Sequence, residues 1–162
     1  MKRQLLKALS VLAIASTALP FATFAAQAQQ QYGITAPIVS GAGTLNRNED
    51  HYIEVQVNGT HPVDRIKVVC VTFHQLSGVT VTNAATRAEI PAEVAYGFEN
   101  FTVTFEEPIQ AGTTIRLVME DSRVRGQFEG LNVPYRVFAV SSDLGEIPIG
   151  TAIVEVPQMG DG

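Results

Sequence analysis

The side chains best suited to chemistry in this sequence are three histidines and a single cysteine. His51, His61, His74 and Cys70 are of the types that bind copper and zinc. Cys70 and His74 lie four residues apart in one predicted strand, which separates them by roughly 13 Å. Ligands of one metal ion must each approach it to about 2.0–2.3 Å. We therefore predict no metal site and no cofactor, and we keep a periplasmic copper-binding protein as an alternative.

The sequence also gives little support for catalysis. Cys70 lies in the most apolar stretch, where a buried thiol acts as a small hydrophobic group with a raised pKa. No Gly-X-Ser-X-Gly motif is present. Acidic residues occur in adjacent pairs, and neighbours in sequence point to opposite sides of a strand: Glu49-Asp50, Glu106-Glu107 and Glu120-Asp121. We predict no catalytic residue, and a hydrolase with an unrecognised site is the other alternative.

Two arginines in a predicted loop are the remaining candidates for ligand binding. Arg123 and Arg125 could bind a phosphate or a carboxylate from a loop. Asp121 and Glu129 lie close in sequence, so we expect local ion pairs instead. The sequence contains no glycine-rich loop of the phosphate-binding kind. We therefore assign no binding site from the sequence.

The first residues have the order of a secretory signal. Three basic residues precede an apolar or small stretch from Ala8 to Ala26, and Ala26-Gln27-Ala28 places small residues at both recognition positions. We predict a signal peptide at 1–28, with cleavage before Gln29 and a periplasmic or extracellular location. An uncleaved membrane anchor is the alternative, but Pro20 and several Ser and Thr residues interrupt the apolar stretch. We expect no stable membrane insertion after cleavage.

Size and charge restrict the possible partners. The formal net charge of the whole chain is −5, and cleavage would make the protein more acidic by removing Lys2, Arg3 and Lys7. This acidity argues against nucleic acid or an anionic membrane as a partner. Residues 29–162 are enough for one domain with its own core. A single cysteine excludes a disulfide framework.

The stretch from Asn100 to Asp121 predicts two strands joined by a corner. On both sides of the corner, apolar residues alternate with polar ones: Phe101, Val103, Phe105, Ile115, Leu117 and Met119. Pro108 and Gly112 predict that the chain leaves the sheet between Glu107 and Gly112. Six residues are too many for a tight hairpin. We expect the chain to cross here from one sheet of a sandwich to the other, with Ile109 packed under the core.

Short segments with a period of two account for most of the remaining chain. We predict strands at Ala36–Ser40, His51–Asn58, Asp64–His74, Gly78–Asn83, Pro134–Val140 and Thr151–Val156. A helical turn is compatible with part of Ala84–Tyr96, but Pro91 interrupts it. Seven or eight strands with little helix favour an all-β antiparallel sandwich over 37–157, and a small β-barrel is the alternative. Residues 29–36 should form a flexible leader, and 158–162 a disordered tail.

Three stretches carry a resemblance to known proteins: Thr102–Pro108 with the following Ala111–Thr114, Tyr135–Val140, and Gly150-Thr151. From Tyr52 to Val156 the chain resembles a family of secreted cyanobacterial proteins, domain of unknown function 2808. It also resembles bacterial immunoglobulin-like domains more loosely. The resemblance implies a secreted protein with an immunoglobulin-like β-sandwich, and it implies no site.

These observations together predict a non-enzymatic protein. We expect a secreted or periplasmic binding or structural module of the cell envelope, with an envelope component of unknown identity as its partner. The sequence assigns this module no catalytic, cofactor-binding or metal-binding residue.

Overall fold

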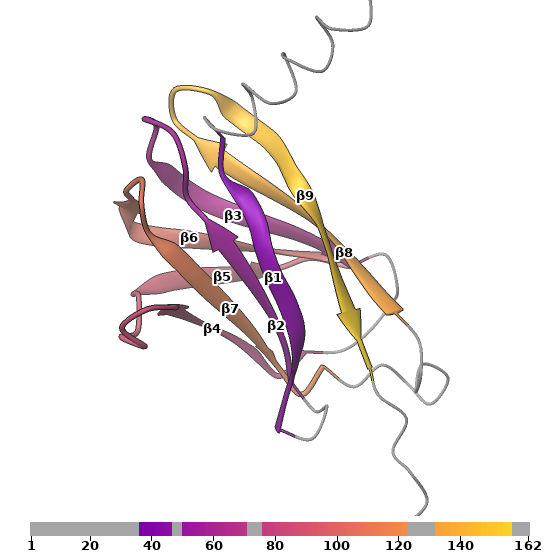
Figure 1. Cartoon of the computed structure of the whole chain (residues 1–162). Coiled ribbons are helices and arrows are strands. Elements are labelled where there is room, and N and C mark those ends of the chain that lie inside the picture. The colour runs from indigo at the N-terminus through magenta and orange to yellow at the C-terminus, as the bar shows by residue number, and fades with distance from the viewer. Residues whose placement is uncertain (1–35, 47–49, 71–75, 123–131, 157–162) are drawn as a thin grey trace, which may run out of the picture.

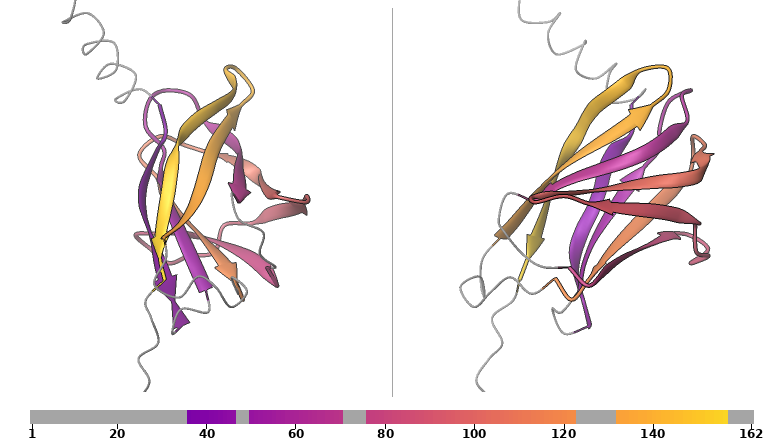
Figure 2. Two further views of the ribbon diagram at one scale, coloured as in Figure 1. Left: turned by 90° about the vertical axis from the view of Figure 1, so that its right-hand side faces the viewer. Right: turned by 180° about the vertical axis from the view of Figure 1, so that it is seen from behind.

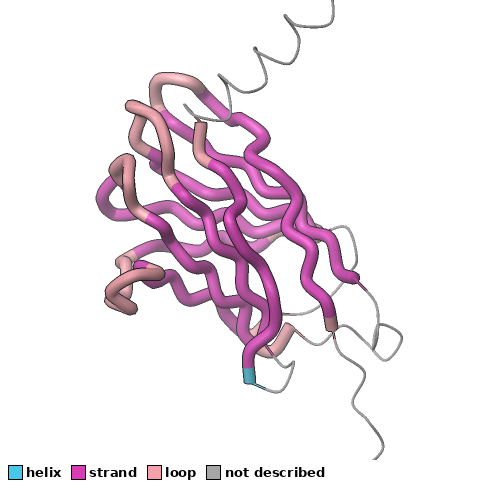
Figure 3. The backbone as a smooth tube through the Cα atoms, in the orientation of Figure 1, coloured by secondary structure: helices cyan, strands magenta, loops and turns pink. Residues whose placement is uncertain are grey.

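The computed structural model describes residues 36–46, 50–70, 76–122 and 132–156. These residues form nine strands and no α-helix, so the backbone is almost entirely strand and loop (Figure 3). The strands are β1 (Ile38–Leu45), β2 (Asp50–Gln56), β3 (Val63–Cys70), β4 (Gly78–Asn83), β5 (Ala92–Tyr96), β6 (Asn100–Ile109), β7 (Thr114–Glu120), β8 (Asn132–Ser141) and β9 (Gly145–Glu155). Within the described parts of the chain, no helix is long and apolar enough to cross a membrane.

The strands form two antiparallel sheets that pack face to face (Figures 1 and 2). One sheet has the order β1-β2-β7-β4, and the other has the order β5-β6-β3-β8-β9. This arrangement confirms the predicted immunoglobulin-like β-sandwich, with nine strands among the described residues where seven or eight were predicted. The barrel alternative is wrong because the two sheets remain separate. β3 lies at the centre of the five-stranded sheet, between β6 and β8.

The alternation seen in the sequence determines which side chains form the core. In β2, β3, β6, β7 and β8, alternate residues are buried between the sheets, as a period of two requires. The central residues of both sheets contribute to one cluster, which includes Ile53, Ile66, Phe101, Leu117 and Tyr135. The intervening residues of each strand point away from the core, so each sheet also presents an outer face.

The two lateral margins of the sandwich differ. At one margin β1 and β9 lie side by side (Figure 1). Gly150 has a φ of +142°, and a Cβ there would lie 3.3 Å from the Val39 side chain of β1, so a glycine permits this approach. At the other margin, β4 and β5 are the edge strands. The connection between them pairs with β4, because the Ile90 N–H donates to the Val81 carbonyl over 2.9 Å.

The corner between β6 and β7 crosses between the sheets as predicted, and Ile109 is buried, with 8% of its surface exposed. The prediction that the chain leaves the sheet at Glu107 is wrong. β6 continues through Pro108, and Ile109 pairs with Val63 beyond an irregularity in the β3–β6 register, where β6 carries the extra residues. Even-numbered residues of β6 direct their N–H groups toward β5, as Glu106 does to the Pro91 carbonyl. Beyond that point β5 has ended, so Pro108 removes no ladder hydrogen bond.

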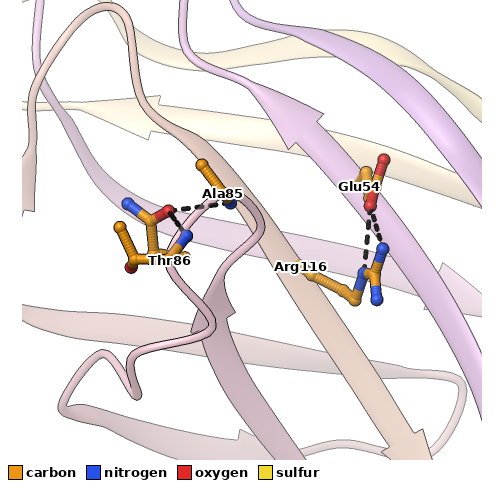
Figure 4. Close-up of polar contacts among 5 residues, drawn as sticks. Glu54, Ala85, Thr86 and Arg116 are labelled. Atoms are coloured by element: carbon orange, nitrogen blue, oxygen red, sulfur yellow. Dashed lines mark hydrogen bonds and ion pairs between the residues drawn. The ribbon is translucent and has the colours of Figure 1, made fainter.

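The segment that was compatible with a helical turn contains a turn and a strand. The Asn83 side-chain oxygen accepts hydrogen bonds from the Ala85 and Thr86 N–H groups, at 2.9 and 3.0 Å (Figure 4). The Arg87 N–H donates to the Asn83 carbonyl. These local bonds close the turn, and the chain then forms β5 because pairing with β6 supplies its backbone partners.

The first strand ends later than predicted, because β1 continues past Ser40 to Leu45. Gly41 pairs with Glu54 and Gly43 pairs with Tyr52, so the glycines sit beneath long side chains of β2. The ninth strand also begins earlier than predicted, at Gly145. The predicted signal peptide and tail lie outside the described residues, and those boundaries remain predictions.

Candidate functional site

The structure places two of the four candidate metal-binding residues, His51 and Cys70, at one end of the core. His51 of β2 is fully buried, and its Nδ1 lies 2.6 Å from the Tyr135 hydroxyl of the facing sheet. Tyr135 is the cross-strand neighbour of Cys70. Burial raises the pKa of the Cys70 thiol to about 11. Burial, and then the nearby Cys70, raise the pKa of Tyr135 well above its usual range. This cluster therefore links the two sheets and holds a protonated thiol.

His61, another candidate ligand, lies away from this cluster. His61 lies after β2, at the end of that strand opposite His51, and its Nδ1 is 3.4 Å from the Asp143 carboxylate. His74 lies outside the described residues, as do Arg123 and Arg125. Among the residues that the structure describes, no three His, Cys, Asp or Glu side chains form a group that could hold a metal ion.

Of the acidic pairs, Glu106-Glu107 lies within β6, whereas Glu120 ends β7 and Asp121 follows it in a turn with a φ of +50°. Glu120 accepts a hydrogen bond from the Thr80 hydroxyl at 2.6 Å. Asp121 instead contacts β2 through its backbone, because its N–H donates to the Asp50 carboxylate at 3.0 Å. Glu49 is outside the described residues. These contacts give the Glu120 and Asp50 carboxylates structural roles in the four-stranded sheet.

On the outer face of the four-stranded sheet, the positive charge of Arg116 is neutralised by Glu54. Arg116 of β7 donates from Nη2 and Nε to Glu54 Oε1 of β2, at 2.6 and 2.9 Å (Figure 4). The Arg116 guanidinium also lies 4.9 Å from the centre of the Tyr52 ring. The Tyr52 ring covers Gly43, since a Cβ at Gly43 would lie only 2.8 Å from it. These contacts satisfy the polar groups of Arg116 and Glu54 within the protein and leave little charge for a ligand.

The outer face of the five-stranded sheet has a different character. Arg65 and Lys67 project from β3 because they alternate with buried residues, and Arg136 projects from β8 for the same reason. In the sheet register Lys67 pairs with Phe138, and Arg136 pairs with Val69. We call the outward residues of these two strands the cationic face: Arg65, Lys67, Val69, Arg136, Phe138 and Val140.

The cations of this face are only partly neutralised. Lys67 Nζ lies 3.2 Å from Glu146 of β9 and 5.6 Å from the centre of the Phe138 ring. Neither Arg65 nor Arg136 forms an ion pair within the described structure, and both are exposed. Arg136 is opposite Val69, four residues along β3 from Arg65, which spreads the charges over roughly 13 Å. Within the described structure, Arg65 and Arg136 therefore place two guanidinium groups without an ion pair on either side of Lys67, although the net charge of the chain is negative.

Hydroxyl groups border this face on both sides. Thr104 of β6 pairs with Arg65, and Thr102 pairs with Lys67. Thr151 of β9 pairs with Arg136 on the other side. Hydroxyls can both donate and accept hydrogen bonds. The surface therefore combines positive charge with polar groups and one aromatic ring, and it can bind an extended anionic molecule without a cavity.

This face could not be predicted from the sequence, for a physical reason. The alternation of Arg65 and Lys67 with Ile66 and Val68 is visible in the sequence, and it shows that the two cations share one face of a strand. Arg136 belongs to a strand more than 60 residues away in the chain. Only the antiparallel register of β3 with β8 brings it beside Lys67. Long-range pairing of this kind leaves no local signal.

Comparison with known proteins gives little further information. No protein-family model matches the chain, and no curated protein matches it in sequence. The resemblance to the secreted cyanobacterial family therefore remains a prediction.

Several solved structures contain a domain of similar shape. The major pilin subunit BcpA of Bacillus cereus matches with a TM-score of 0.45 and 12% identity, over 74% of this chain and 40% of the pilin chain. The Enterococcus faecalis adhesin ACE gives 0.44 and 11%, over 77% and 51%. The collagen adhesin CNA of S. aureus gives 0.42 and 7%, over 76% and 49%. This chain thus spans about half or less of each protein, and likenesses this distant carry no argument about its function.

Proposed function

We propose that this protein is a non-enzymatic binding module of the cell envelope, periplasmic or extracellular, that holds an anionic polysaccharide on its cationic face. The observation that carries the proposal is the pair of exposed arginines, Arg65 and Arg136, which form no ion pair within the described structure. Arg116, on the opposite outer face, is by contrast bound to Glu54. Among the strand residues that the structure describes, arginines without an ion pair therefore lie on the outer face of the five-stranded sheet only.

The chemistry of the face suits a polymer that carries carboxylate groups. A guanidinium can donate two parallel hydrogen bonds to a carboxylate, which gives orientation as well as attraction. The flat sheet and the bordering threonines suit sugar hydroxyls, and the Phe138 ring offers an apolar surface beside Lys67. Each exposed ion pair contributes little, about 0–1 kcal/mol. Measurable affinity would therefore depend on several contacts along an extended ligand and should weaken with salt.

The test is binding of residues 29–162 to a polyuronate, followed by calorimetry, with neutral dextran as the comparison polymer. The charge-reversal double variant Arg65→Glu/Arg136→Glu should bind at least tenfold more weakly, which corresponds to about 1.4 kcal/mol. Arg87→Glu is the matched control, because Arg87 is also exposed but belongs to the 83–88 turn. It should bind as the wild type does.

Two results would contradict the proposal. One is equal binding of the polyuronate by the wild type and by the double variant. The other is equal binding of dextran and polyuronate at low salt, because the attraction would then not be electrostatic. Circular dichroism of the double variant must match the wild type, which is expected because both arginines lie on the outer face.

A further inference from the structure

The edge strand β5 differs from the other edges of the two sheets. β1 and β9 lie beside each other, and both contain a register irregularity. β4 is partly covered at its edge, because Thr82 of β4 pairs with Glu89 of the connection between β4 and β5. β5 pairs with β6 in a regular register on one side, and no described residue pairs with its other side. Exposed regular edges of this kind readily accept another strand.

Alternate residues of β5 direct their backbone N–H and C=O groups to opposite sides, which shows which of these groups β6 does not bond. The Pro91 carbonyl accepts from the Glu106 N–H, and the Gly97 N–H donates to the Asn100 carbonyl, so the odd-numbered residues of β5 bond to β6. The even-numbered residues must point the other way. Ile90 follows this alternation, since its N–H donates to β4. Ala92, Val94 and Tyr96 therefore direct their N–H and C=O groups out of the sheet at its edge.

The side chains at this edge are also apolar. Tyr96 is 56% exposed, and Phe98, in the hairpin that follows, is 82% exposed. These are two of the four large hydrophobic side chains that are exposed among the described residues. β5 contains no lysine, proline or bulge of the kind that protects an edge, and its one charged residue is Glu93. Exposed apolar side chains beside backbone N–H and C=O groups that point out of the sheet favour pairing with a strand of another protein molecule.

We propose that β5 pairs antiparallel with β5 of a second copy of this chain, about a two-fold axis at Val94. This register makes a hydrogen-bonded pair of Val94 with the partner's Val94 and places Ala92 opposite the partner's Tyr96. All three open residues on each copy then find backbone partners, at two hydrogen bonds for each residue pair.

The side chains of β5 are complementary to themselves in this register. The large, exposed Tyr96 ring lies beside the small Ala92 side chain of the partner subunit. Glu93 lies opposite the partner's Ala95, so like charges do not face each other directly. A shift of the two-fold axis to another even-numbered residue leaves part of β5 without a partner. The strand thus specifies one symmetric arrangement, which is the closed kind of interface found in most dimers.

The register can be tested with two variants that each add one cysteine to the buried Cys70, namely Glu93→Cys and Ala95→Cys. Positions 93 and 95 form a non-hydrogen-bonded pair across the two-fold axis, with Cα atoms about 4.5 Å apart. This distance is within the range that a disulfide spans, about 4.4–6.8 Å. Position 93 is about 8 Å from its own symmetry mate by strand spacing and rise. A mixture of the two variants should therefore form disulfide dimers under mild oxidation, and neither variant alone should do so.

The second measurement is sedimentation equilibrium of residues 29–162. The wild type should associate reversibly to a dimer, and Val94→Pro should weaken the association at least tenfold. Proline at 94 removes only an N–H that points out of the sheet, so the domain should keep its circular dichroism spectrum. A wild type that stays monomeric at every accessible concentration overturns the proposal, as does equal cross-linking by either cysteine variant alone. If Val94→Pro fails to fold, the cysteine mixture still decides between these outcomes.

Discussion

Gly112 allows the cost of a backbone conformation to be measured apart from steric effects. Its φ is +88°, and its N–H donates to the Val57 carbonyl over 2.8 Å, which fixes the end of the crossing between the sheets. A Cβ added at this position meets no atom within 4 Å. Any loss of stability on substitution by alanine must therefore come from the positive φ. A non-glycine residue held in this region costs about 1–3 kcal/mol.

We expect a graded series at this position. Gly112→Asn should be mildest because asparagine tolerates this region, Gly112→Ala should cost about 1–2 kcal/mol, and Gly112→Val should cost the most. Urea unfolding with unchanged m values would measure the series. Gly78→Ala is the control, because a Cβ there meets only the flexible end of Glu120 at 2.9 Å and the φ is not positive. The reasoning fails if Gly112→Val melts with the wild type, or if Gly112→Asn is as costly as Gly112→Val.

Three buried residues, Tyr135, Cys70 and Ile109, provide further tests of the core. Tyr135→Phe should lower the free energy of unfolding by about 1–3 kcal/mol in urea melts, because it removes the hydroxyl bonded to buried His51. The Cys70 thiol should resist maleimide in the folded protein. Because its folded pKa is raised from 9.0 to about 11, the unfolded state ionises first, and stability should fall as the pH rises from about 9 to about 11. Ile109→Asp should destabilise strongly, whereas exposed Gln110→Ala should change the urea midpoint little.

The parts of the fold that were predictable from the sequence are those set by neighbours along the chain. The alternation around Phe101 and Leu117 predicted which side chains are buried, because the side-chain period of a strand is fixed by its geometry. The length of the corner between them predicted a crossing between sheets. Gly112 was predicted to end the segment that leaves the sheet, and its φ of +88° lies in the region that favours glycine.

The parts that were not predictable depend on pairing between distant segments. β5 follows Pro91 and contains one Glu and two Ala, which are residue types that do not favour a strand. It forms because β6 supplies hydrogen bonds to its odd-numbered residues. β1 extends through a glycine-rich segment because Glu54 and Tyr52 of β2 cover the glycines. The cationic face likewise exists only because β3 lies beside β8.

The two proposed surfaces have a joint consequence. Pairing of β5 strands about a two-fold axis perpendicular to the sheet would join two five-stranded sheets edge to edge. Both cationic faces would then lie on the same side of one continuous sheet. A long polyuronate could contact both copies, and the second contact would be intramolecular, which raises the apparent affinity without any new contact.

This arrangement predicts how polymer length and dimerisation interact. Val94→Pro should weaken binding of a long polyuronate severalfold, because each monomer then binds alone. It should leave binding of a short oligouronate unchanged, since a short ligand reaches one face only. Arg65→Glu/Arg136→Glu should instead weaken both. Calorimetry with size-fractionated oligouronates separates these effects. If Val94→Pro weakens short and long ligands equally, β5 contributes to binding directly and the two surfaces are not independent.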